Sequence, residues 1–360
     1  MDISKIDKNF ANSFTYEGMK LYNVNESPFK LYGLCREEGE LDFKRTPHNF
    51  PDTVDNPVIK AMYKKTSGIR VRFQTDSKRF ILKCELPEKA NIPHMATTGS
   101  SCFDMYVDGT YFNVFRPGID VNGKFSEDKS MDGGYASGYT LKGEKKMREI
   151  LIHFPLYNEV TNVYIYLEED AQVLETAGYP DDKPVVFYGS SITQGACASH
   201  PGNCYMAMLA RHFDFNYVNL GFSGGCRAEL EFARYIAGLD MKAFVFDYDH
   251  NAPQPADLEA THEPFFKEFR RLRPDVPVIF NTVSDLCHGV EKRALRRDII
   301  KKTYENAVAA GDQNVYFVDG SVAYDLPGVE LCTVDNAHPN DLGFWCIYRN
   351  MIPAFEWLFK

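Results

Sequence analysis

The sequence has 360 residues, 44% of them hydrophobic, which is enough for a sizeable buried core and more than one typical domain needs. The formal net charge is −10 and no stripe of Lys and Arg is present, which argues against nucleic acid as a partner. Nine cysteines without a CxxC pair are expected to be reduced, mostly buried thiols.

The N-terminal stretch has neither a basic start nor the apolar segment of a signal peptide, and no apolar run reaches the ~20 residues of a membrane span. We therefore expect a cytoplasmic protein that has no contact with a membrane, provided that the sequence begins at its natural start.

The first half of the sequence, from about Phe14 to Leu167, alternates polar and apolar residues with period two, as in IRVRF at 69–73, and this pattern predicts strands. Asp108-Gly109 lies between two aromatic-rich arms and predicts a tight hairpin, because both turn positions require positive φ. Many short strands and few helical stretches predict an antiparallel, jelly-roll-like β-sandwich.

The pattern changes in the segment 168–184, where glycine, proline and aspartate interrupt any regular element. We place a domain boundary there, with an N-terminal domain at residues 1–178 and a second domain at 179–360. Apolar runs such as VVFYGS and AFVFDYD then alternate with amphipathic stretches, which predicts a parallel sheet with helices on both faces. Five such units predict a flavodoxin-like three-layer α/β/α domain, whose ligand site lies at the carboxyl ends of the strands.

A pair of serines follows the first apolar strand of the second domain, in YGSSITQG at 188–195. A serine at this point lies near a helix N-terminus, where a sheet of this kind places its site. Taken alone, Ser190, Ser191 and Thr193 fit equally well as turn and capping residues.

The last loop of the domain, TVDNAHPNDLGFW at 333–345, holds Asp335 three residues before His338. Both side chains can lie at the same edge of the sheet as Ser191. His338 could then take the proton of the serine hydroxyl while Asp335 orients the imidazole. A lone loop histidine is more often bonded to backbone, but the paired aspartate favours a catalytic role.

Two further strand ends offer donors for a developing oxyanion, namely Gly224 in NLGFSGG and Asn251 in DYDHNAP. A glycine lets its backbone N–H approach a substrate, and an asparagine offers a side-chain amide. Each residue alone would be interpreted as a turn residue.

These residues together resemble the SGNH/GDSL hydrolases, whose four blocks contribute Ser, Gly, Asn and His in this order. The resemblance implies a catalytic triad of Ser191, Asp335 and His338. It also implies an oxyanion hole formed by the backbone N–H of Ser191, by Gly224 and by Asn251. No metal or organic cofactor is required by such a mechanism.

The bacterial branch of this family that the chain most resembles has an N-terminal domain with a GxDLY-like motif, which CFDMY at 102–106 approximates. Three positions depart from the family pattern. Ser190 replaces the aspartate of GDS, Ala252 follows Asn251 where many relatives have aspartate, and Met105 replaces the leucine of the motif. The first two changes leave the chemistry intact but weaken inference about the substrate.

An alternative nucleophile is Ser223, because GFSGG at 221–225 matches the G-x-S-x-G elbow between a strand and a helix. Only one strand–helix unit precedes it, whereas an elbow of that kind normally follows several strands of the same sheet. We therefore favour Ser191.

A second alternative is a metal-dependent phosphoesterase with ligands drawn from the acidic residues and histidines near the strand ends. Their spacing does not favour this interpretation, because no HxH or HxxxH unit is present. The candidate ligands are Asp247, Asp249, His250, Asp335 and His338.

A third alternative is a carbohydrate-binding protein with a weakly active esterase domain. Aromatic side chains of the hairpin could stack on sugars, although they are expected to alternate between core and surface. These aromatic residues are Tyr106, Tyr111, Phe112 and Phe115.

We predict a serine esterase that forms an acyl-enzyme on short-chain esters, with acetylated carbohydrate as the first expectation by fold-level analogy. A small-molecule or oligosaccharide ester is then its partner. No lipase-type lid or interfacial helix is visible in the sequence. The sequence leaves the oligomeric state open, a homo-oligomer included.

Overall fold

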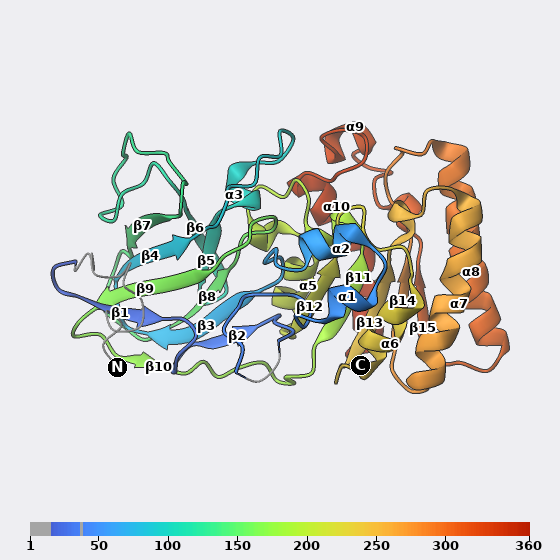
Figure 1. The fold of residues 1–360 in the computed structure, drawn as a ribbon, viewed down its shortest axis with the longest axis horizontal. Coiled ribbons are helices and arrows are strands. Elements are labelled where there is room, and N and C mark those ends of the chain that lie inside the picture. The colour runs from blue at the N-terminus through green and yellow to red at the C-terminus, as the bar shows by residue number, and fades with distance from the viewer. Residues whose placement is uncertain (1–15, 37–38) are drawn as a thin grey trace.

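The computed structural model describes residues 16–36 and 39–360, so Phe14, at the start of the period-two pattern, lies outside the described residues. Antiparallel strands fill the first half of the chain, and a parallel sheet with helices fills the second half (Figure 1). The predicted fold class, a β-sandwich followed by a three-layer α/β/α unit, is confirmed.

Two antiparallel sheets form the sandwich. The first has the strand order β1-β9-β4-β7, with bounds Met19–Asn23, Asn162–Glu168, Arg79–Glu85 and Tyr135–Thr140. The second has the order β10-β3-β8-β5-β6, with β2 also paired to β3; its bounds are Val173–Leu174, Arg70–Thr75, Arg148–His153, Phe103–Val107, Thr110–Phe115 and, for β2, Lys30–Tyr32. Side chains such as Phe73, Leu82 and Ile152 are fully buried in the core between these sheets.

The predicted hairpin joins β5 to β6. Its turn consists of Asp108, with φ +49°, and Gly109, with φ +76°. Positive φ at both positions is what a two-residue turn requires for the twist of its strands to match.

The second half contains a parallel sheet of five strands in the order β12-β11-β13-β14-β15, the flavodoxin-like order. Its central strands are buried along their whole length, because helices cover both faces. The bounds are Tyr217–Gly221, Val185–Gly189, Ala243–Asp247, Val278–Asn281 and Val315–Val318.

Helices cover the sheet on both sides. One core contains apolar residues of α6 and α7, such as Phe232 and Phe265, and the other contains residues of α5 and α10, such as Leu209 and Phe355. The longer helices are α5 Tyr205–Phe213, α6 Leu230–Gly238, α7 Pro255–Leu272, α8 Val290–Ala309 and α10 Asp341–Leu358. The shorter ones are α3 Thr97–Ser100, α4 Ser191–Gln194 and α9 Val329–Cys332, with 3₁₀ turns η3 Pro201–Asn203, η4 Asp249–Asn251 and η5 Gly320–Val322.

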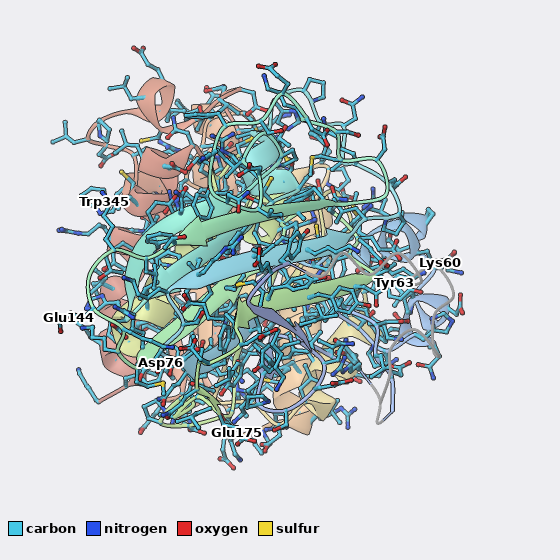
Figure 2. All side chains as sticks on the ribbon, turned by 90° about the vertical axis from the view of Figure 1, so that its left-hand side faces the viewer. Lys60, Tyr63, Asp76, Glu144, Glu175 and Trp345 are labelled. Atoms are coloured by element: carbon cyan, nitrogen blue, oxygen red, sulfur yellow. The ribbon has the colours of Figure 1, made fainter. Side chains whose placement is uncertain are left out.

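Two short helices of the first half, α1 (Phe50–Thr53) and α2 (Pro57–Met62), lie beside the parallel sheet rather than on the sandwich (Figure 1). Phe50 stacks on Tyr235 of α6, with ring centroids 4.2 Å apart. This contact means that the first half supplies part of the core of the second half. Seen from the sandwich end, Lys60 of α2 and Trp345 of α10 lie at opposite edges of the molecule (Figure 2).

Each helix within residues 16–36 and 39–360 is too short or too polar to span a lipid bilayer.

Candidate active site

Ser191 lies at the start of helix α4, directly after strand β11. The preceding Ser190 caps this helix, because its hydroxyl oxygen accepts a hydrogen bond of 3.1 Å from the backbone N–H of Ile192. Ser190 is thus the capping residue, and the hydroxyl of Ser191 does not take part in capping the helix.

The side chains of Ser191, His338 and Asp335 form one hydrogen-bonded chain. Ser191 Oγ lies 2.9 Å from His338 Nε2, and His338 Nδ1 lies 2.7 Å from Asp335 Oδ2. The other carboxylate oxygen, Oδ1, accepts the backbone N–H of His338 at 2.7 Å. The structure therefore brings together the three residues that were predicted from the sequence.

The hydrogen bonds fix the protonation pattern of His338. An ionised carboxylate only accepts, so Nδ1 must carry the proton and Nε2 is left to accept from the serine hydroxyl. Partial burial disfavours the charge on Asp335, but the N–H groups of His338 outweigh this effect and lower the pKa of the carboxyl. This arrangement can remove a proton from Ser191 and stabilise the imidazolium that results.

Gly224 and Asn251 lie on the loops that follow β12 and β13. Gly224 is exposed and has φ +70°, a conformation that residues with a side chain rarely adopt. Asn251 donates one amide hydrogen to the carbonyl of Phe222 at 3.1 Å, which links the two loops. A second hydrogen on the same nitrogen remains available for another acceptor.

Asp247 lies at the end of β13 and is buried. Its buried carboxylate accepts hydrogen bonds from Thr193, Tyr205 and Asn281, at 3.0, 2.8 and 2.9 Å, and so links the end of β13 to α4, to α5 and to the end of β14. Burial raises the pKa of Asp247, and the three donors act in the opposite direction.

The acidic residues of the metal-dependent alternative do not form a ligand cluster. Among the residues that the structure describes, two groups have converging ligand atoms, and neither includes Asp247, Asp249 or Asp335. Asp249 instead accepts the backbone N–H of Val283 at 2.9 Å.

Ser223, the alternative nucleophile, lies in a different setting from Ser191. Its backbone N–H donates to the side chain of Gln194 at 2.9 Å. Residues 222–229 separate the end of β12 from the start of α6, so the sharp strand-to-helix turn of a nucleophile elbow is missing here.

Residues of the first half also border the site, and no local sequence signal predicted them. The hydroxyl of Tyr157 donates to the carbonyl of Ser191 at 3.3 Å. The exposed ring of His94 lies 5.2 Å from that of His338, and the carbonyl of His94 accepts a 3.5 Å hydrogen bond from the thiol of Cys197. The sandwich half therefore borders the nucleophile and its base.

The aspartate of the CFDMY motif joins the two halves of the chain. Asp104 is fully buried on β5 and contacts His153 Nδ1 of the sandwich at 2.7 Å. Its other oxygen lies 2.6 Å from both His200 Nδ1 and the backbone nitrogen of Gly202, which belong to the second half. Burial disfavours its charge, but the two imidazoles outweigh this and hold the pKa of Asp104 well below its usual range.

The aromatic residues that could stack on sugars divide between core and surface, as expected. Tyr106 and Phe115 are buried, whereas Tyr111 is 44% exposed. The ring of Tyr111 stacks on that of His200 at a centroid distance of 4.4 Å.

Comparison with known families matches both halves of the chain. Residues 182–353 match the GDSL-like lipase/acylhydrolase family, and residues 19–173 match the family described as the N-terminus of SGNH-hydrolase-type esterases. The chain belongs to the SGNH/GDSL hydrolases. The resemblance that the sequence blocks indicated is thereby confirmed. A comparison with curated proteins finds no match.

Solved structures are similar to this chain over nearly its whole length. A putative GDSL-like lipase from Bacteroides ovatus is 26% identical with a TM-score of 0.80, over 94% of this chain and 98% of that chain. A salicylyl-acyltransferase from a tetracycline biosynthetic pathway is 19% identical with a TM-score of 0.76, over 96% and 99%. An acetyl xylan esterase from the rumen bacterium Butyrivibrio proteoclasticus is 13% identical with a TM-score of 0.54, over 94% and 99%. This SGNH/GDSL protein is a hydrolase of the esterase type.

Proposed function

We propose that the protein hydrolyses short-chain acyl esters through an acyl-enzyme on Ser191. The observation that carries this proposal is the chain of hydrogen bonds from Ser191 through His338 to Asp335. His338 takes the hydroxyl proton as the oxygen attacks the ester carbonyl, and it then protonates the leaving alcohol. A water molecule, deprotonated by His338, then attacks the acyl-enzyme and releases the carboxylic acid and the free Ser191.

The negative charge of the tetrahedral intermediate needs donors that are already in place. The backbone N–H groups of Ser191 and Gly224 and the second amide hydrogen of Asn251 are the proposed donors. The bond from Asn251 to Phe222 supports this assignment because it holds the two loops together, and the positive φ of Gly224 suits a residue without a side chain. Loss of one such donor typically costs about 3 kcal/mol of transition-state stabilisation.

An acetyl ester of a carbohydrate is the proposed substrate. Ser191 is only 4% exposed, which favours a small acyl group over a long chain. The structural likeness to an acetyl xylan esterase supports the same class by analogy of fold. The exposed Tyr111 offers an aromatic ring at the junction of the two halves, of the kind that packs against sugars.

The mechanism is tested by hydrolysis of p-nitrophenyl acetate in the presence of EDTA. We expect Ser191→Ala to lower kcat by at least about 10³-fold, because the acyl-enzyme can no longer form. Ser223→Ala is the matched control and should retain activity. Loss of activity in Ser223→Ala with full activity in Ser191→Ala would refute the proposed mechanism.

The substrate class is tested with p-nitrophenyl esters of increasing chain length and with acetylated xylose and cellobiose. Activity should fall as the acyl chain lengthens, and acetate should be released from the sugars at a kcat/KM at least equal to that for p-nitrophenyl acetate. A preference for octanoate or longer chains would contradict the acetyl assignment while leaving the mechanism intact.

A further inference from the structure

Three side chains that the proposed mechanism does not use converge beside the candidate active site. His250 lies in η4, after β13, and Cys287 and His288 lie in the loop between β14 and α8. Cys287 Sγ is 3.9 Å from His250 Nε2, and the rings of His250 and His288 have centroids 5.4 Å apart. One ligand atom from each of the three residues lies within 4.8 Å of the other two.

One nitrogen of this cluster has no hydrogen-bond partner among the described residues. His288 Nε2 is buried and has no hydrogen bond among the described residues. The buried carboxylate of Asp285 lies 3.2 Å from His250 Nδ1, and its other oxygen accepts the backbone N–H of Cys287 at 2.9 Å. Asp285 therefore contacts the imidazole of His250 and the backbone of Cys287, and a carboxylate on the far nitrogen of a histidine orients that ring in metal sites.

We propose that His250, Cys287 and His288 form a binding site for a single Zn²⁺ ion. Imidazole and thiolate ligands favour Zn²⁺ over the hard cations Mg²⁺ and Ca²⁺. In a tetrahedral site with ordinary bond lengths, a nitrogen and a sulfur ligand lie about 3.6 Å apart. The observed 3.9 Å between His250 and Cys287 needs only a small contraction. Cys287 is exposed, so the ion can enter from solvent.

A second group, His94, Cys197 and His338, also has converging ligand atoms but is less suited to a metal ion. Both ring nitrogens of His338 are already engaged, by Ser191 and by Asp335. Cys197 is buried, and burial raises the pKa of its thiol to about 12, which opposes formation of a thiolate. In the cluster at Cys287 the thiol is exposed, and the partner of His250 Nε2 is Cys287 Sγ, which is itself a proposed ligand atom.

Metal binding at this site would join the loop that carries Asn251 to the loop after β14. His250 is the direct neighbour of Asn251, and its ring lies 6.3 Å from that of His338. Zn²⁺ is therefore expected to stabilise this side of the candidate active site and to raise the melting temperature, since a ligand that binds only the folded state stabilises that state.

The test is titration of the full chain, first freed of metal, with Co²⁺ as a spectroscopic substitute for Zn²⁺. We expect one equivalent of Co²⁺ to give the d–d bands of a tetrahedral site and a thiolate-to-cobalt charge-transfer band. Zn²⁺ should abolish both and raise the melting temperature. Cys287→Ser should lose the charge-transfer band, and His288→Ala should weaken Co²⁺ binding at least tenfold.

Cys197→Ser is the matched control and should keep the full spectrum. The proposal is overturned if the charge-transfer band persists in Cys287→Ser, disappears in Cys197→Ser or never forms in the wild type. Melting curves of the metal-free variants, compared with the metal-free wild type, establish that each one is folded. None of these readouts depends on ester hydrolysis, so failure of the metal site is distinguishable from failure of the proposed esterase mechanism.

Discussion

The ring of His94 lies 5.2 Å from that of His338, although the two residues belong to different halves of the chain. His94 is exposed and precedes the short helix α3, whereas His338 lies in the loop before α10. The loop of the first half thus forms one wall beside the proposed general base.

Replacement of His94 by alanine should have only a moderate effect on chemistry. The hydrogen bonds of His338 run to Ser191 and Asp335 and do not involve the side chain of His94. We expect His94→Ala to lower kcat/KM for p-nitrophenyl acetate by less than about tenfold, against the far larger loss on removing a triad member. A loss as large as that of Ser191→Ala would show that His94 takes part in proton transfer.

Asn251→Ala should lower kcat for p-nitrophenyl acetate by about 10²–10³-fold with little change in KM, because an oxyanion donor acts mainly in the transition state. Steady-state kinetics at several substrate concentrations separates the two constants. Asn122→Ala, in the sandwich half, is the control and should match the wild type. An unchanged kcat in Asn251→Ala would remove this residue from the oxyanion hole.

Asp104→Asn should destabilise the protein, because the buried carboxylate bridges His153 of the sandwich and His200 of the second half. Removal of one partner from buried hydrogen bonds of this kind typically costs about 1–3 kcal/mol. Thermal unfolding should show a lower melting temperature for Asp104→Asn and no change for the exposed control Asp132→Asn. Equal melting temperatures for Asp104→Asn and the wild type would contradict a structural role for this contact.

Much of the fold was predictable because strands carry local signals. A strand buried on both faces needs successive apolar residues, and VVFYG became β11. A half-buried strand alternates, and residues 69–73 fall largely within β3. Asp335 and His338 could be paired for a similar reason. They are three positions apart in one short loop, so their side chains must lie close together.

Contacts between the halves could not be predicted in this way. Phe50 and Ile59 lie in the first half but are buried in the core around α6, and nothing in their immediate sequence distinguishes them from residues of the sandwich. The sequence indicated the motif that contains Asp104 but not its partners, because His153 and His200 approach it only through tertiary packing. The positions of His94 and Tyr157 beside the candidate active site could not be predicted for the same reason.

The buried His262 of α7 should make stability depend on pH. Its ring stacks on Phe246 at 4.5 Å and its Nδ1 lies 2.9 Å from the hydroxyl of Thr303. Burial lowers the pKa of His262 to about 3, whereas a histidine in the unfolded chain has a pKa of about 6.5. Between these values the unfolded state binds the extra proton, so stability is lost as the pH falls, by about 1.4 kcal/mol per pH unit for one proton.

His262→Gln removes this titration and keeps a polar partner for Thr303. The melting temperature of the variant should therefore fall less steeply than that of the wild type as the pH is lowered from about 6.5 towards 4. The exposed His212→Gln is the control and should follow the wild-type curve. If the curves of His262→Gln and the wild type run parallel over this range, His262 does not enter the folded state as a neutral imidazole, and the acid sensitivity arises elsewhere.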